Sequence, residues 1–133
     1  MKGGEVMKFF KCNICGNIVE LVKNGGGELV CCGEPMEKML PNTTDEGNEK
    51  HLPEIKVVDN EVFVEVGSIL HPMEEKHYIE WIVLLYNNKV KKIKLKPGDE
   101  PKAIFKIDED FKTLEVYEYC NIHGLWKNVY VKS

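Results

Sequence analysis

The sequence contains no arginine, so all 18 of its basic residues apart from histidine are lysines. Arginine is the side chain whose shape best matches phosphate and guanine edges, because its planar fork donates two parallel hydrogen bonds. The net charge of -4 also opposes binding to a polyanion. The composition therefore argues against nucleic acid as a partner.

Long apolar runs are missing as well. The longest, residues 82–85, is far shorter than the roughly 20 residues of a membrane helix. The first residues, MKGGEVMKFFKC, lack the apolar stretch of a secretory signal. With 43% hydrophobic and 30% charged residues, the sequence is typical of a globular protein. We expect no membrane association and a cytoplasmic location.

Histidine and cysteine are scarce and segregated. Four of the five cysteines lie within the first 32 residues, whereas all four histidines lie after residue 50. In a reducing compartment an odd number of cysteines argues against a disulfide framework and favours metal binding.

Two regions of the sequence differ in amino-acid composition. Residues 1–41 are rich in glycine and hold few large apolar residues, so we expect a small domain that needs a metal as a staple. The polar segment PNTTDEGNEK then reads as a linker or surface loop. Residues 42–133 contain seven short runs rich in Val, Ile, Tyr and Phe, separated by turn signals such as Asn87-Asn88 and Pro97-Gly98. The sequence therefore predicts an all-β protein, with a seven-stranded immunoglobulin-like antiparallel β-sandwich after the small domain.

Four cysteines of the first region have metal-ligand spacing. Cys12 and Cys15 form a CxxC pair, and Cys31 and Cys32 are adjacent. Neighbouring Cα atoms are about 3.8 Å apart, closer than an unstrained disulfide prefers, so the adjacent cysteines are poorly placed to pair. Four thiolates suit a tetrahedral zinc or a single iron equally, and a disulfide or free thiols remain alternatives.

The run FKCNIC...GNIVELV...GGGELVCCGEPMEKM resembles desulforedoxin and the first domain of desulfoferrodoxin. The resemblance covers about residues 8–40 and favours one iron held by Cys12, Cys15, Cys31 and Cys32. Such a centre is either an electron carrier or a structural staple.

The remaining candidate ligands all lie where a loop meets a predicted strand: His51, His71, His77, Cys120 and His123. Such borders gather at the ends of a sandwich, where several loops approach one point. Each histidine taken singly could be an ordinary surface residue, and Cys120 a small core residue.

Together, four imidazoles and one thiolate are too many for a tetrahedral zinc site. A blue-copper site would need a methionine after His123, and there is none. A mononuclear iron with four nitrogens, one sulfur and one open position fits the inventory better.

The segments EKH at 49–51, HPMEEKHYIEW at 71–81 and CNIHGLW at 120–126 resemble, in order, the ligand motifs of superoxide reductase as found in desulfoferrodoxin. The resemblance implies four equatorial imidazoles and Cys120 as the axial sulfur. It also implies Glu49 as the carboxylate that takes the sixth position when the iron is ferric, and Lys50 as the adjacent cation. Pro72 restricts the backbone of His71 and so orients its ring, and Trp126 is a candidate shield for the sulfur.

The implied activity is reduction of superoxide to hydrogen peroxide, with a rubredoxin-like electron donor and a homodimer as expected partners. Two alternatives stay open from the residues alone. One is an electron-transfer protein with two metal centres and no substrate, and the other is a zinc-stapled binding module.

Overall fold

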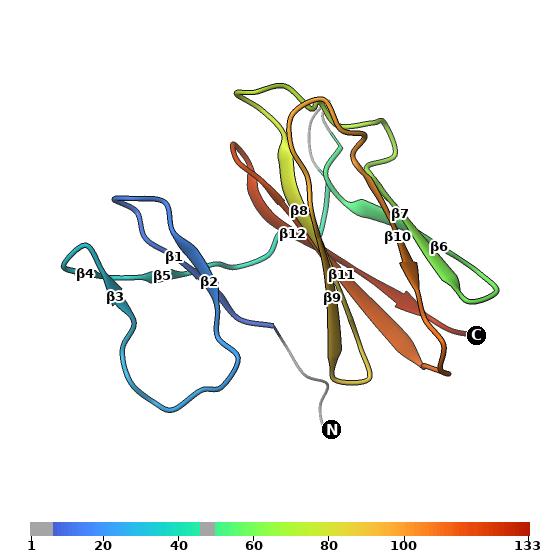
Figure 1. Ribbon diagram of the computed structural model, residues 1–133, viewed down its shortest axis with the longest axis horizontal. Coiled ribbons are helices and arrows are strands. Elements are labelled where there is room, and N and C mark those ends of the chain that lie inside the picture. Colours follow the sequence, from blue (N-terminus) through green and yellow to red (C-terminus); the bar gives the residue numbers. More distant parts are fainter. Residues whose placement is uncertain (1–6, 46–49) are drawn as a thin grey trace. The chain divides into compact units, whose positions relative to one another are not determined.

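The computed structural model describes residues 7–45 and 50–133. Within those ranges the chain forms twelve β-strands and no helix, as the all-β prediction requires. None of these residues belongs to a helix with the length and apolarity needed to cross a membrane. The strands fall into two compact units, Met1–Leu40 and Pro41–Ser133 (Figure 1).

The first unit is small and thinly packed. Strand β1 (Phe9–Lys11) lies between β2 (Ile18–Glu20) and β5 (Glu37–Lys38), and β3 (Val30–Cys31) pairs with β4 (Glu34–Pro35) in a separate hairpin. Among its described residues only Phe9 and Cys12 are buried. Two buried side chains cannot offset the conformational entropy lost by ordering such a segment, so the unit depends on another source of stability.

The second unit consists of two antiparallel sheets. One has the order β10 (Lys102–Lys106), β7 (Glu61–Val66), β6 (Pro53–Val58); the other has the order β12 (Gly124–Val131), β11 (Thr113–Cys120), β8 (Ile79–Tyr86), β9 (Lys89–Lys94). The seven strands correspond one by one to the seven predicted runs, which confirms the sandwich.

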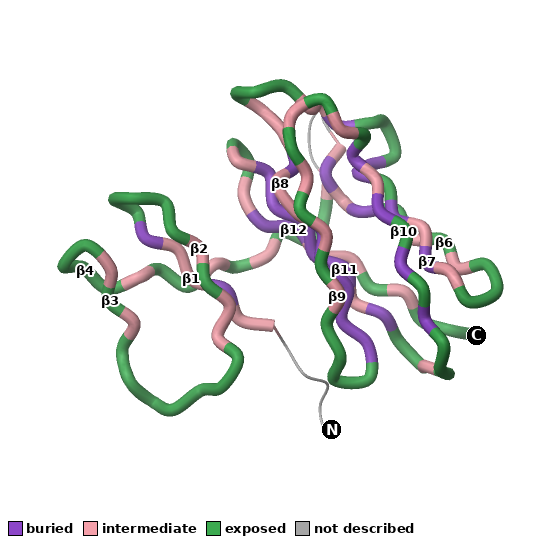
Figure 2. Tube along the Cα trace, in the orientation of Figure 1, coloured by how far each residue is buried: buried purple, intermediate pink, exposed green. Residues whose placement is uncertain are grey.

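The core lies between these sheets. In β7 the valines at 62, 64 and 66 are at most 1% exposed while the residues between them face outward, the period-two pattern read from the sequence. They pack with Ile82 and Leu84 of β8 and with Val116 of β11. Each such side chain contributes about 1.5–3 kcal/mol when it leaves water. Figure 2 shows the buried segments running along these strands.

Turns fix the register at both ends of the sandwich. Asn87 and Asn88 have φ of 47° and 63°, the left-handed pair that a two-residue hairpin turn requires. Strand β12 begins at Gly124, before the Val- and Tyr-containing run at 127–132 that marks it in the sequence. Gly124, with a φ of 87°, ends the turn after β11, so Cys120 and His123 lie at one tight hairpin.

Candidate metal centres

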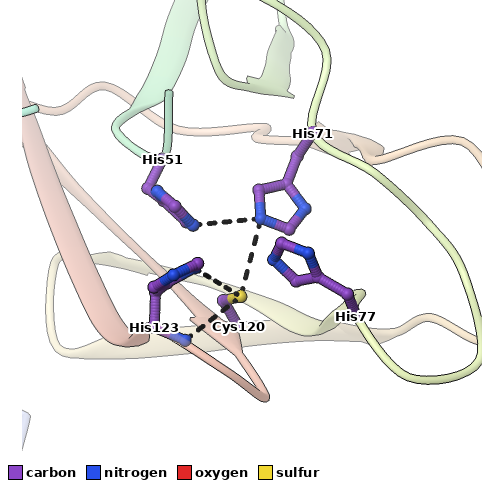
Figure 3. A group of neighbouring side chains, drawn as sticks. All are labelled: His51, His71, His77, Cys120 and His123. Carbon is purple, nitrogen blue, oxygen red and sulfur yellow. Dashed lines mark hydrogen bonds between the residues drawn. The ribbon is translucent and has the colours of Figure 1, made fainter. Parts of the chain in front are cut away.

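Five side chains from three parts of the second unit meet at one end of the sandwich. They are supplied by the segment before β6, the β7–β8 connection and the β11–β12 hairpin: His51, His71, His77, Cys120 and His123. Their candidate ligand atoms all lie within 4.8 Å of one another (Figure 3). The structure thus brings together the same set that the sequence singled out.

The four imidazoles form a closed ring of neighbours. Ring centroids are 4.6 Å apart for His51 and His71, 4.7 Å for His71 and His77, 5.2 Å for His77 and His123, and 4.8 Å for His123 and His51. Every adjacent pair meets edge to face. Each ring offers one candidate ligand nitrogen to this cluster, so a single metal ion could contact all four imidazoles.

The Cys120 sulfur lies against this ring. Its Sγ is 3.5 Å from His71 Nε2 and 3.9 Å from His123 Nδ1. The pairing of β11 with β8 shifts register between Tyr119 and Cys120, and such a bulge re-aims the side chain next to it. Cys120 is fully buried and His123 is exposed, so the sulfur faces the core while part of the ring faces solvent.

Hydrogen bonds fix the orientation of two ligands. His71 Nδ1 lies 2.7 Å from the carbonyl oxygen of Pro72, which leaves Nε2 for a metal. The Asp45 carboxylate accepts the backbone N–H groups of His51 at 2.8 Å and Leu52 at 3.0 Å. Asp45 was not identified from the sequence, because nothing in the pattern of a polar loop marks which acid turns back onto the chain.

Asn121 is a second residue that sequence reasoning missed. Its side-chain amide donates to the carbonyl of Lys76 at 3.0 Å, and its oxygen accepts the N–H of Tyr78 at 2.9 Å. These two contacts flank His77, so Asn121 ties the hairpin that carries Cys120 to the loop that carries His77.

Trp126 stacks on an imidazole. Its ring is 4.6 Å from that of His51 with only 11° between the planes, and its Nε1–H donates to the carbonyl of His123 at 3.2 Å. Trp126 therefore braces two members of the ring, and its role as a shield for the sulfur stays a prediction.

A buried carboxyl group lies under the site. Glu118 is two residues before Cys120 on the inward face of β11, is 0% exposed, and has no hydrogen-bond partner for either oxygen among the described residues. Burial, and secondarily the charge of Asp45, raises the pKa of Glu118 well above the usual value. Burial thus favours the neutral, protonated form of this carboxyl group.

The donor set fits a metal ion with more than four ligands. Two ligand nitrogens about 2.1 Å from one ion and at right angles are about 3.0 Å apart, and His51 Nε2 and His71 Nε2 are 3.0 Å apart. Imidazole and thiolate together suit iron, and five donors leave one octahedral position for another ligand.

The second cluster is in the first unit. Cys12, Cys15, Cys31 and Cys32 have Sγ atoms within 4.8 Å of one another, and those of Cys15 and Cys31 are 3.6 Å apart. Tetrahedral bonds of about 2.3 Å separate two sulfurs by about 3.8 Å, so this cluster fits a single tetrahedral ion. None of the five cysteines, all of them described, is in a disulfide.

Local hydrogen bonds prepare this cluster for metal. The backbone N–H groups of Cys15 and Ile14 donate to Cys12 Sγ, each at 3.4 Å, and lower the pKa of Cys12 to about 6. The other thiols lie close to that sulfur. A hydrogen bond with Cys15 is the main cause that raises the pKa of Cys31, and the same kind of contact raises the pKa of Cys32 to about 12. One thiolate is thus present at neutral pH, and a metal must displace protons from Cys31 and Cys32.

Lys50 and Glu49 are the two residues predicted to lie at the open position, and only Lys50 is among the described residues. Lys50 is half-buried and directly precedes the buried His51. Glu49 lies outside the described residues. The roles of both stay predictions.

Comparison with known proteins agrees with both clusters. The desulfoferrodoxin family model matches residues 43–129, and the model of the desulfoferrodoxin N-terminal domain matches residues 4–39. This chain belongs to the desulfoferrodoxin family. It is 56% identical over 124 residues to a desulfoferrodoxin homolog of Archaeoglobus fulgidus, covering 93% of this chain and 98% of that protein. It is 52% identical over 120 residues to the desulfoferrodoxin of Nitratidesulfovibrio vulgaris, covering 90% and 94%.

A solved relative of this desulfoferrodoxin-family chain shares its architecture. The crystal structure of the superoxide reductase from Treponema pallidum aligns with a TM-score of 0.80 at 31% identity, covering 94% of this chain and 99% of that chain. At that identity and coverage, the likeness extends through both regions of the sequence.

Proposed function

We propose that this member of the desulfoferrodoxin family is a superoxide reductase. The reaction adds one electron and two protons to superoxide and yields hydrogen peroxide without releasing oxygen. The observation that carries the proposal is the closed ring of four imidazoles with a single buried thiolate against it. The activity named for the Treponema pallidum relative supports it.

In this proposal five side chains hold the metal: His51, His71, His77, His123 and Cys120. Iron, when bound there, supplies a one-electron redox couple with an open position. The Cys120 thiolate donates electron density from the buried side, and the imidazoles add no negative charge. Burial keeps water from the sulfur, while the exposed edge at His123 leaves a route for a small anion.

Lys50 is the proposed cation beside the open position. The chain as a whole has a charge of -4, so a superoxide anion approaches an unfavourable average field. A local ammonium group at the site offsets this field and raises the rate of encounter. Its N–H groups can also order the water that delivers a proton to the product. Glu49 remains the proposed sixth ligand of the idle, oxidised centre.

The four cysteines of residues 1–41 are proposed to hold a second iron, and residues 42–133 to form the reductase domain. An iron bound by four thiolates cycles between two states by one electron, which suits a relay from a small rubredoxin-like donor. The described part of residues 1–41 buries few side chains, so we propose that this region gains stability by packing against a second copy of the chain. Thiols used as ligands also favour the reducing cytoplasm.

The test is direct. Iron per chain is measured on purified protein, spectra are recorded oxidised and reduced, and superoxide generated by pulse radiolysis is mixed with the reduced form. We expect rapid oxidation of the histidine-bound iron and about one peroxide per superoxide consumed. A protein that holds iron in both centres and does not react would instead be an electron carrier without a substrate, and zinc in both centres would indicate a binding module.

A further inference from the structure

One glycine in the second unit is in unusually close contact with another segment. A Cβ atom built on Gly67 would lie 2.8 Å from the carbonyl oxygen of Lys50, 2.9 Å from its carbonyl carbon and 3.1 Å from its Cβ. Real Cβ atoms essentially never come within 3.0 Å of such atoms. Among the glycines that the structure describes, no other would place a Cβ within 4 Å of a neighbouring atom.

Both segments in this contact lead directly to metal-centre residues. Lys50 immediately precedes His51. Gly67 lies in the turn from Val66 to His71, which is closed by a hydrogen bond of 2.8 Å from the His71 N–H to the Val66 carbonyl. At the far ends of these segments the two imidazoles meet, with 3.0 Å between their Nε2 atoms.

Gly67 differs from the two other glycines that the structure describes in the second unit in why a side chain is excluded there. Gly98 and Gly124 have φ of 93° and 87°, so their backbone angles require glycine. Gly67 has no such φ, and its requirement is space for the main chain of Lys50.

We propose that Gly67 is a positioning residue for superoxide reduction. The missing side chain lets the Lys50 main chain pack directly on the turn of residues 66–71, and this contact sets where Lys50 stands beside the histidine ring. The inference deepens the proposed function and rests on it. Gly67 itself touches neither substrate nor metal.

The effect of adding a methyl group at position 67 follows from the atoms that it would meet. Its neighbours are mainly backbone atoms, which cannot rotate away as the end of a flexible side chain would. Gly67→Ala must therefore move the Lys50 segment or the turn by several tenths of an ångström or more. A shift of the Lys50 segment displaces its ammonium group, and a shift of the turn displaces His71 relative to that group. Displacements approaching 1 Å at a reacting centre can cost about a hundredfold in rate.

The experiment compares iron-loaded wild type with Gly67→Ala by pulse radiolysis at several salt concentrations. We expect the second-order rate constant with superoxide to fall at least about tenfold at low salt, since steering accounts for factors of that size. We also expect its salt dependence to weaken, a change that a merely structural defect would not produce. Gly27→Ala is the matched control, because Gly27 has open space around it and no positive φ.

A double-mutant cycle with Lys50→Ala tests the route of the effect. If Gly67 acts through Lys50, the variant with both changes is about as slow as the slower single variant, because the same contribution is lost once. Multiplying effects, or a Gly67→Ala rate and salt dependence equal to those of wild type, would overturn the proposal.

A measurement on the unaltered chain covers the case in which Gly67→Ala does not fold. In zinc-loaded protein, which is diamagnetic, proton NMR should show strong nuclear Overhauser contacts between the Gly67 Hα atoms and Lys50; their absence would reject the contact. A wild type that does not consume superoxide would reject the proposed function alone, because this NMR contact does not depend on activity.

Discussion

At the scale of single residues, the second unit places a carboxyl group and a thiol on the same buried face of β11. Glu118 and Cys120 are both fully buried, two positions apart. Burial disfavours charge on the carboxyl, whereas a metal would stabilise charge on the thiol. The two acidic groups on this strand face thus differ in environment, because only Cys120 is among the candidate metal ligands.

The pKa of Glu118 predicts how stability depends on pH. Because its pKa is raised in the folded state, the folded chain keeps a proton that the unfolded chain loses. The contribution of Glu118 to the free energy of unfolding is fully present below the ordinary glutamate pKa. It is lost as pH rises toward the pKa of the folded state, by about 1.4 kcal/mol per pH unit. Glu118→Gln should remove this loss.

The measurement is urea unfolding of both iron-loaded proteins at pH 5 and pH 7, where the stability difference should shift in favour of Glu118→Gln as pH rises. Glu54→Gln, an exposed acid on β6, is the control. Equal pH dependence in wild type and Glu118→Gln would show that the carboxyl is ionised in the folded state.

The cysteine thiols give a second prediction at this scale. At pH 7 metal binding must displace the protons of Cys31 and Cys32, whose pKa values are raised. Affinity for Zn²⁺ at the four-cysteine centre should thus rise by about a hundredfold or more per pH unit near neutrality. Competition with a chromophoric chelator at pH 6.5 and 7.5 measures this; a pH-independent affinity would contradict the protonation states described above.

At the scale of elements, the site depends on how loops are joined at one end of the sandwich. Strands β8 and β11 are eight residues long, mostly buried and paired with each other as far as Cys120. Cys120 is the last residue of β11, His123 lies in the turn that follows it, and His77 lies two residues before β8. Asn121 is the side chain that links two of these loops, through both of its polar atoms.

Asn121→Ala should weaken the histidine centre. With both hydrogen bonds gone, the loop on either side of His77 is less ordered, and loss of such outer contacts typically costs about 10–100-fold in metal affinity. Iron retention against a chelator is the measurement. Asn87→Gly is a matched control: it also removes two side-chain hydrogen bonds, to Glu109 and Asp110, in a turn at the other end of β8 whose φ suits glycine. If both variants lose iron equally, Asn121 has no special role.

At the scale of the whole molecule, the chain has two compact units, each with its own cluster of ligands. No ligand of one cluster comes from the residues of the other unit. The two centres should therefore assemble independently, even if electrons pass between them during turnover.

Cys12→Ser tests this independence. Serine cannot replace the thiolate, so the first centre should lose its iron and the iron content should fall by about half. The rate constant of the reduced histidine centre with superoxide should stay within about twofold of wild type, because none of its ligands has changed. Metal analysis and pulse radiolysis on the same sample check both points; a folded variant unable to consume superoxide would contradict independence.

Much of the fold and the whole candidate ligand set could be predicted from the sequence, because each depends on a small number of residues with a clear pattern. Period-two alternation in residues 61–66 depends only on which face of a strand meets the core, so the pattern predicted β7 directly. The ligand set could be predicted because histidine and cysteine are scarce and occur in motifs that resemble a known family. The start of β12 could not, because Gly124 to Trp126 has no alternation to mark a strand.

The sequence by itself therefore determined which residues can bind metal and which strands hide their side chains, since both are properties of residue type and local spacing. Only the tertiary structure decided that the four imidazoles close into a ring, that Asp45, Asn121 and Trp126 brace it, and that Lys50 rests on Gly67. These contacts join segments far apart along the chain, and the space left by a missing side chain becomes visible only when both segments are folded.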